Sequence, residues 1–161
     1  MRITQTHVYF WESYFSQWYR SPFMEDGITF QTAEHYMMYH KAKLFGDTFI
    51  ATKVLETAHP KHVKALGRQV SNFNKAIWDQ HCDAIVIKGN LLKFSQNSLL
   101  LANITTHSDK IFVEASPVDL IWGVGLHEND DLILDESNWT GLNKLGNALT
   151  TVSQLLKDIK C

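Results

Sequence analysis

A series of helix start and stop signals between residues 32 and 104 constrains the fold more than any other feature of this sequence. Thr32 can cap a helix that continues to Leu44, because its hydroxyl can accept a backbone N–H from the first turn. Gly46 follows at the position where glycine commonly ends a helix. Similar signals predict further helices over residues 48–57, 60–66, 74–94 and from 97 or 98 to 104, and a last amphipathic helix with apolar residues from 145 to 159.

Strand-like segments are few and short. Residues 7–11, 28–30 and 110–115 carry the β-branched and aromatic residues typical of strands. An aromatic stretch over residues 14–22 predicts irregular structure, and the acidic residues 127–137 predict a mobile loop. Because the order of elements is neither alternating strand and helix nor all strand, the sequence predicts a mainly α fold with a small β component (α+β), as one domain over residues 1–161.

The composition narrows the classes of function. A net charge of −2 gives no sign of the basic surface that nucleic-acid-binding proteins carry. The N-terminus lacks the apolar stretch of a signal peptide, and charges interrupt every apolar run well short of a membrane span. Cys82 and Cys161 are far apart, which favours a reducing compartment over a disulfide framework. We therefore expect a soluble, cytoplasmic protein without membrane contact.

The first predicted helix presents a carboxylate and an ammonium group on one face. Glu34 lies in the first turn, where the helix dipole favours a negative charge. Lys41 comes seven residues later, which returns it to about the same face two turns along, with Met38 between them. Glu34 could instead serve only as a partner of the dipole.

Three other features could carry chemistry. Glu114 and Asp119 lie around a strand break, although Asp119 could instead cap the segment after Pro117. In Trp122-Gly123 the glycine can let a ligand approach the backbone closely, or it can serve a turn. The third feature is a scatter of cations, which are Lys41, Lys43, Arg68 and Lys93. Most lysines on protein surfaces are simply solvated.

The histidines do not predict a metal site. The chain has eight, but His35 and His40 are five residues apart on a helix and so face different ways. His59 and His62 are separated by Pro60 and have no third ligand nearby in the sequence. We expect no metal and no cofactor.

Ten short motifs follow one another along the chain. They are FS (15–16), SPF (21–23), DGITF (26–30), TAEHY (32–36), KA (41–42), LGR (66–68), KFSQN (93–97), EASPVD (114–119), IWGVGL (121–126) and WTGLNKLG (139–146). In this order they resemble the NADAR family, also called YbiA-like. The resemblance covers about residues 10–156, and ten motifs in one order are a specific signal although each is short.

The resemblance implies a function as well as a mainly helical fold. Characterised members are N-glycosidases; one group hydrolyses early riboflavin-pathway intermediates to ribose 5-phosphate and a pyrimidine, and others remove ADP-ribose from guanine in DNA. The family positions fall on Glu34, Lys41, Arg68, Lys93, Glu114, Asp119, Trp122, Gly123 and Asn143.

This sequence departs from the usual family pattern at four positions. Gln17 stands where the family commonly has Asn, and Cys82 where an Arg is common. Thr150 and Ser153 stand where the closing helix usually has Met and Arg. The loss of cations is expected to weaken or reshape a phosphate contact, whereas the carboxylates and the Trp-Gly pair are intact.

These residues lead to a hypothesis for the reaction. Glu34 would act on the ribose and on water, with Asp119 or Glu114 as the second carboxylate that assists the leaving group or orients the sugar. Phosphate would be bound by the cations and the base by Trp122, with Trp18. The expected substrate-binding residues are Lys41, Arg68, Lys93, Trp122, Gly123, Asn143 and Trp18.

The expected partner is therefore a small ribosylated molecule, and two alternatives stay open. One is an ADP-ribosyl glycohydrolase that acts on modified guanine in DNA, because a flipped base needs only a small contact surface. The other is a non-catalytic module that binds ADP-ribose or nucleotides.

Overall fold

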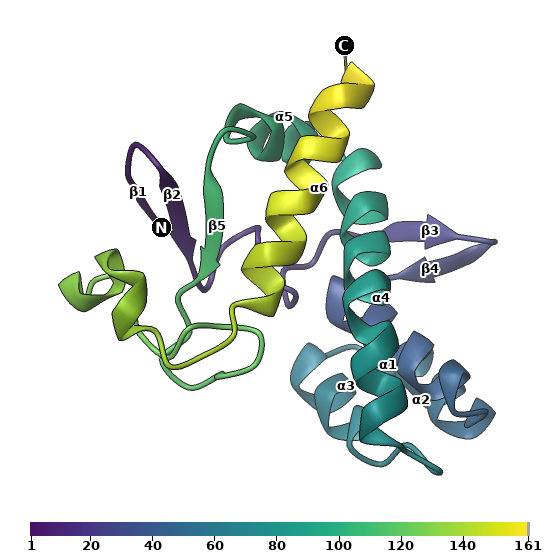
Figure 1. Cartoon of the computed structure of the whole chain (residues 1–161). Coiled ribbons are helices and arrows are strands. Elements are labelled where there is room, and N and C mark those ends of the chain that lie inside the picture. The colour runs from purple at the N-terminus through teal and green to yellow at the C-terminus, as the bar shows by residue number, and fades with distance from the viewer. Residues whose placement is uncertain (161) are drawn as a thin grey trace. The chain divides into compact units, whose positions relative to one another are not determined.

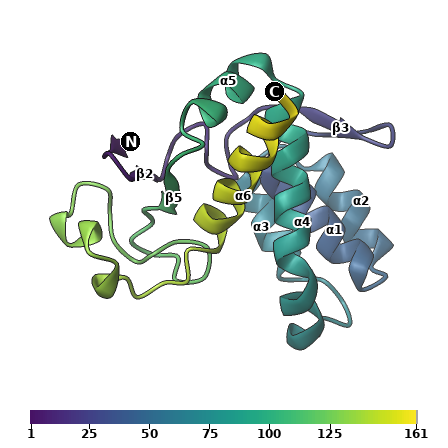
Figure 2. The ribbon, with the colours of Figure 1, turned by 45° about the horizontal axis from the view of Figure 1, so that its top comes forward.

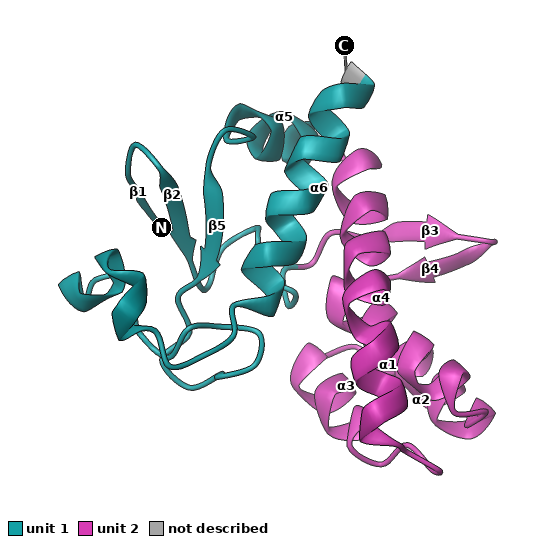
Figure 3. Ribbon diagram, in the orientation of Figure 1, with its two compact units in different colours: residues 1–19, 98–161 teal, residues 20–97 magenta. Residues whose placement is uncertain are grey.

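The chain divides into two compact units in a computed structural model that describes residues 1–160, with only the backbone of residue 160. Unit 1 comprises Met1–Tyr19 and Ser98–Cys161, and unit 2 comprises Arg20–Asn97 (Figure 3). Cys161 itself lies outside the described residues. The single domain expected over residues 1–161 stays a prediction.

Unit 2 begins with a hairpin. Strand β3 (Phe23–Glu25) pairs antiparallel with β4 (Ile28–Phe30). Asp26 and Gly27 have φ angles of 50° and 80°, as the two central residues of a tight hairpin turn require. The sequence predicts the turn and β4, whereas β3 was not predicted because Phe23–Glu25 is short and follows a proline.

Four helices complete unit 2 (Figures 1 and 2). They are α1 (Ala33–Leu44), α2 (Thr48–Glu56), α3 (Pro60–Gly67) and α4 (Lys75–Ser95). The predicted cap at Thr32 is confirmed, because Thr32 Oγ1 accepts the His35 N–H at 3.2 Å. Asp47 caps α2 in the same way, since its Oδ1 accepts the Ile50 N–H at 3.0 Å. Helix α1 packs against the other three helices, so it forms the centre of the unit.

A buried aromatic cluster joins the hairpin to α1. The rings of Phe23, Phe30 and Tyr36 lie between 5.0 and 5.8 Å apart, measured between centroids. Glu25 adds a polar link, since its carboxylate accepts the Tyr36 hydroxyl at 3.0 Å and contacts His40 Nε2 at 3.0 Å. These contacts fix the orientation of α1, the helix that carries Glu34.

Unit 1 is built on a three-stranded sheet. The strands are β1 (Arg2–Ile3), β2 (His7–Phe10) and β5 (Ile111–Glu114), in the order β1-β2-β5. Strand β2 pairs parallel with β5, with Val8 opposite Phe112. Helices α5 (Ser98–Thr106) and α6 (Lys144–Lys160) complete the unit. Its buried cluster consists of Tyr9, Val113, Ala115, Val124 and Ile133.

Helix α6 runs along the outer edge of β5 (Figure 1). Thr150 Oγ1 accepts the Phe112 N–H at 2.9 Å, and the Asn143 side chain bonds the Phe112 carbonyl and the Glu114 N–H, each at 3.0 Å. The Val124 N–H donates to the Glu114 carbonyl at 3.1 Å. The edge of β5 is thus paired by side chains of a helix and by a loop instead of by another strand.

The acidic segment 127–137 is more regular than the sequence predicts. It contains two short 3-10 helices, η1 (Asp131–Leu134) and η2 (Glu136–Asn138). Arg2 Nη2 pairs with Asp131 at 3.0 Å, and the indole N–H of Trp139 donates to the Ile133 carbonyl at 2.8 Å. The expectation of a loop throughout is wrong here, because Asp130 and Asp135 cap the two short helices by accepting the N–H groups of Leu132 and Ser137.

The predicted class, mainly α with a small β component, is confirmed by these elements. Within the described residues, no helix combines the length and the apolarity needed to cross a bilayer.

Gly146 should be intolerant of any side chain, because a Cβ there would collide with the Phe112 carbonyl and with the Asn143 side chain. Alanine improves helix propensity by about 1 kcal/mol, but a clash with fixed backbone costs about 1–3 kcal/mol. We expect Gly146→Ala to lower the free energy of unfolding, measured by urea denaturation. Thr151→Ala, at an exposed position of the same helix, is the control. A Gly146→Ala protein more stable than wild type would contradict the close approach of α6 to β5.

Candidate functional site

Three of the predicted site residues come together in unit 2. Glu34 lies in the first turn of α1 and is buried, with 6% of its surface exposed. Burial lowers the pKa of Lys41, the negative charge of Glu34 raises it, and the positive charge of Arg68 lowers it. Glu34 and Lys41 lie on one face of α1, and Arg68 follows Gly67, which packs against Met38 of the same helix.

Gly67 brings Arg68 to this region. A Cβ at Gly67 would overlap Met38, so the end of α3 approaches α1 more closely than a larger residue would allow. Met38 lies one turn after Glu34, on the helix face that the sequence predicts. Arg68 follows directly as the C-terminal cap of α3.

Two aromatic rings near Lys41 were missed by sequence reasoning. Lys41 Nζ lies 4.7 Å from the centroid of Phe73 and 5.6 Å from that of Trp78, within the range of a cation–π interaction. Phe73 precedes α4 and Trp78 lies in its first turns. No periodic pattern links these rings to α1, because they approach Lys41 only through the packing of α4.

His35 fastens the start of α1 to the end of α2. Its Nε2 lies 2.7 Å from the Thr57 carbonyl, which can only accept, so Nε2 carries the proton. The Thr32 hydroxyl, 2.7 Å from Nδ1, then donates to that nitrogen. Burial lowers the pKa of His35. The residue next to Glu34 is therefore a neutral structural link.

Lys93 differs from the other predicted cations. It lies near the end of α4 and is fully buried. Burial lowers its pKa to about 7, and Nζ lies 4.9 Å from the centroid of the Phe94 ring. Its side chain has no surface exposed to a substrate in this structure, so its predicted role in phosphate binding stays a prediction.

A second group of predicted residues comes together in unit 1 around Glu114, the last residue of β5. Glu114 is half-buried, and its backbone N–H and carbonyl are bonded to Asn143 and Val124. Gly123 packs so closely that a Cβ there would lie 3.0 Å from the Glu114 carbonyl oxygen and 2.9 Å from that of Asp119. The glycine of the Trp-Gly pair thus serves close packing within unit 1.

Asp119 caps the turn that leads to Trp122. Its Oδ1 accepts the N–H groups of Ile121 and Trp122, both at 2.9 Å. Its own N–H donates to Ser116 Oγ at 3.0 Å. This is the capping role that the sequence offers as the alternative for Asp119, and a catalytic role stays a prediction.

Trp122 is half-buried and lies near a cation. Lys144 Nζ lies 5.8 Å from the centroid of the Trp122 ring. The Trp122 carbonyl accepts the Leu145 N–H at 3.1 Å and the Ile121 carbonyl accepts the Lys144 N–H at 3.2 Å. These contacts use N–H groups at the start of α6 that would otherwise be available to an anion.

Trp18 belongs to the irregular segment at the end of the first part of unit 1. It is 41% exposed, and its backbone N–H donates to Ser16 Oγ at 3.2 Å. Its predicted role in stacking a base stays a prediction.

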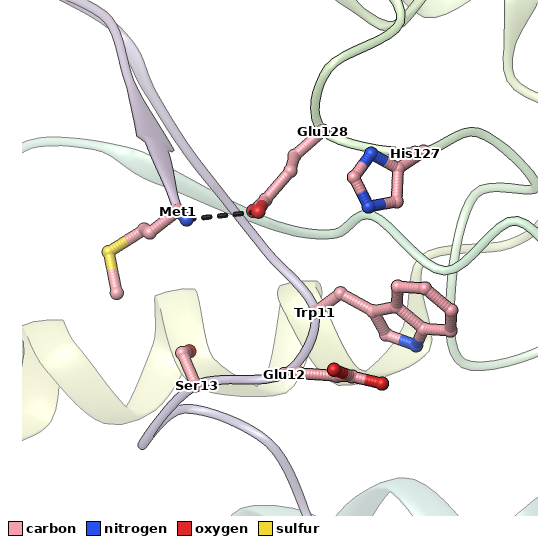
Figure 4. Close-up of a pocket in the computed structure, with 6 residues that line it drawn as sticks. All are labelled: Met1, Trp11, Glu12, Ser13, His127 and Glu128. Atoms are coloured by element: carbon pink, nitrogen blue, oxygen red, sulfur yellow. Dashed lines mark hydrogen bonds and ion pairs between the residues drawn. The ribbon is translucent and has the colours of Figure 1, made fainter.

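Unit 1 contains a cleft of about 230 Å³ whose lining includes none of the predicted site residues. Its lining residues are Met1, Trp11, Glu12, Ser13, His127 and Glu128 (Figure 4). Glu128 pairs with the α-amino group of Met1 at 3.0 Å, and the ring of His127 meets that of Trp11 edge-on. Among residues 1–160, no group of three or more His, Cys, Asp or Glu side chains is arranged to hold a metal ion.

The chain is similar to known proteins both in sequence and in structure. The model of the NADAR domain matches residues 9–157. The N-glycosidase R617 of Acanthamoeba polyphaga mimivirus is 43% identical over 87% of this chain and 85% of its own length. The N-glycosidase YbiA of Escherichia coli is 28% identical over 71% of this chain and 68% of its own length. The NMR structure of E. coli YbiA superimposes with a TM-score of 0.78 at 24% identity, covering 99% of this chain and 89% of that one.

His35 should remain neutral to a lower pH than a histidine in an unfolded chain. Its folded pKa lies below the ordinary 6.5, so as pH falls below about 6.5 the unfolded chain takes up a proton first and His35 lowers stability. We expect 15N-detected NMR to show a ring with the proton on Nε2 at pH 6.5, assigned by its loss in His35→Gln. A charged ring, or a proton on Nδ1, would contradict the link to Thr57.

Lys93 should make the free energy of unfolding rise with pH in the alkaline range. Between about 7 and the ordinary 10.5 the unfolded chain holds a proton that folded Lys93 has released, so the unfolding free energy rises with pH across this window. Lys93→Met should lose this rise in denaturant titrations from pH 7 to about 10. Lys61→Met, at an exposed position on α3, should retain it. Equal pH dependence in wild type and Lys93→Met would refute the lowered pKa.

Proposed function

Because the chain belongs to the NADAR domain family, we propose that it is an N-glycosidase that cleaves the bond between a ribose phosphate and the nitrogen of a base or amine. Several relatives are named N-glycosidase, including those of mimivirus and E. coli, which supports hydrolysis of an N-glycosyl bond. The ribose phosphate and the leaving group are our extension of that activity.

The observation that carries the proposal is the charge arrangement in unit 2. A buried carboxylate, Glu34, lies in the same region as Lys41 and Arg68. Hydrolysis of an N-glycoside passes through a state with positive charge on the sugar, which a carboxylate stabilises. Phosphate is bound by cations, and a guanidinium group can bind two of its oxygens at once.

The reaction would proceed by attack of water on the anomeric carbon. Glu34 accepts a proton from that water as the new C–O bond forms and the C–N bond breaks. The leaving nitrogen takes up a proton, so the products are ribose phosphate and the free base or amine. The helix dipole at the start of α1 favours the ionised form of Glu34 before the reaction.

Glu114 is our choice for the second carboxylate. Asp119 Oδ1 already accepts two backbone N–H groups and would lose them if it moved toward a substrate. The backbone of Glu114 is fixed by hydrogen bonds to Asn143 and Val124, and its half-buried side chain stands at the end of β5. Its role would be to assist the leaving group or to orient the sugar hydroxyls.

For the substrate we propose early riboflavin intermediates, the ribosylaminopyrimidine phosphates. They combine a reactive N-glycosidic bond with a ribose phosphate of the size that one carboxylate and two cations can bind. ADP-ribosylated guanine in DNA shares the bond type and is the competing substrate in the assay below.

Glu34→Gln should abolish most hydrolysis while leaving the fold intact, because Gln keeps the size of Glu but cannot take a proton from water. We expect kcat to fall by about 100-fold or more, measured by chromatography of products from ribosylaminopyrimidine phosphate. NAD, ADP-ribose and ADP-ribosylated DNA are incubated in parallel. Glu56→Gln, at an exposed glutamate of α2, should retain full activity.

Two results would count against the proposal. Near-normal turnover by folded Glu34→Gln would remove Glu34 from the reaction. Saturable binding of nucleotides by wild type without product from any of the four substrates would indicate a non-catalytic binding module.

A further inference from the structure

We propose that Asn143 and Thr150 of unit 1 are positioning residues, which hold Glu114 by pairing the free edge of β5 instead of binding substrate. This inference rests on the proposed function, because it takes Glu114 as a carboxylate that acts in the reaction. It assigns a different role to Asn143 from that implied by the family motif, and it gives a role to Thr150.

Gly146 and Thr150 lie on one face of α6, because they are four residues apart in the helix. A Cβ at Gly146 would collide with the Phe112 carbonyl and with the Asn143 side chain, so this glycine lets α6 approach β5 closely. Asn143 lies immediately before α6, and its side chain reaches the same strand.

The amide of Asn143 is already used at both ends. Nδ2 donates to the Phe112 carbonyl and Oδ1 accepts the Glu114 N–H, each at 3.0 Å. The residue is 3% exposed and has a φ angle of 53°, and its own N–H donates to the Gly123 carbonyl at 3.1 Å. Nδ2 also lies 3.5 Å from Asn147 Oδ1, so the buried amide is surrounded by protein partners, and exchanging them for a substrate would be unfavourable.

Glu114 is held on both sides of the strand as a result. Its N–H bonds Asn143 and its carbonyl bonds the N–H of Val124, while the next residue pairs with β2. The peptide groups that flank Glu114 therefore cannot rotate without breaking one of these bonds. The backbone from which the Glu114 side chain extends is therefore fixed. This matters for a reacting group, since a displacement of about 1 Å can cost 100-fold in rate.

Thr150 adds a second pairing at Phe112, two residues before Glu114. Its hydroxyl accepts the Phe112 N–H at 2.9 Å and donates to the Gly146 carbonyl at 2.9 Å. Thr150 thus pairs the backbone of β5 at a second position, in addition to Asn143.

The first test measures the pairing directly, without reference to activity. Thr150→Val keeps the shape of the side chain and removes the acceptor of the Phe112 N–H. We expect amide hydrogen exchange at Phe112 to be about tenfold faster, as for loss of one hydrogen bond. Thr150→Ser should restore protection. Thr151→Val is the matched control, because Thr151 is exposed and its hydroxyl donates to the Asn147 carbonyl in the same way.

The second test separates positioning from substrate binding. With the ribosylaminopyrimidine phosphate as substrate, Asn143→Ala and Thr150→Val should each lower kcat, by about tenfold or more for Asn143→Ala, with KM changed less than about twofold. The serine variant should recover kcat, and Thr151→Val should equal wild type. Thr150→Val keeps the test decisive if Asn143→Ala does not fold.

The outcomes distinguish this inference from the function beneath it. A rise in KM at constant kcat for Asn143→Ala would show a substrate ligand and overturn the positioning role. Unchanged exchange at Phe112, or unchanged kcat with faster exchange in Thr150→Val, would overturn it as well. If wild type releases no ribose phosphate while Thr150→Val still speeds exchange at Phe112, the proposed function fails, whereas the pairing of β5 by Thr150 stands without a catalytic consequence.

Discussion

The structure of unit 1 depends on how the unpaired backbone groups of β5 are satisfied. An edge strand exposes N–H and carbonyl groups that must find partners or remain in water. Here the partners are the Asn143 amide, the Thr150 hydroxyl and the Val124 N–H. Because these groups come from α6 and from the loop before it, the same hydrogen bonds join the sheet, the Trp-Gly segment and the last helix.

Unit 2 solves a different problem, the burial of charge. Glu34 is nearly buried in the first turn of α1, where the helix dipole favours a negative charge, and Lys41 lies on the same helix. Lys41 in turn lies within cation–π range of the Phe73 and Trp78 rings. Burial of ionisable side chains costs folding free energy, and clusters of such side chains are typical of functional sites.

Local signals in the sequence predicted much of this. Thr32, Asp47, Pro60 and Gly46 mark helix ends because caps and turns are formed by neighbours along the chain. The shared face of Glu34 and Lys41 follows from helix geometry. Sequence reasoning missed Phe73 beside Lys41 and the pairing of Asn143 with β5, because each depends on contact between segments that are remote along the chain. It also missed the short helices within 127–137, although Asp130 and Asp135 cap them locally. The family resemblance located Asn143 but could not tell a ligand from a strand partner.

The order of the two units along the chain has a consequence for biosynthesis. Unit 2 is one uninterrupted segment, Arg20–Asn97, whereas unit 1 joins Met1–Tyr19 to the segment that follows Ser98. During translation, all contacts of unit 2 can therefore form while β2 still lacks β5, its parallel partner about a hundred residues later. Closure of so long a loop is slow, and the β5 edge gains its side-chain partners only after Thr150 has been made. The contacts of unit 2 can thus be complete on the nascent chain before those that surround Glu114 can form.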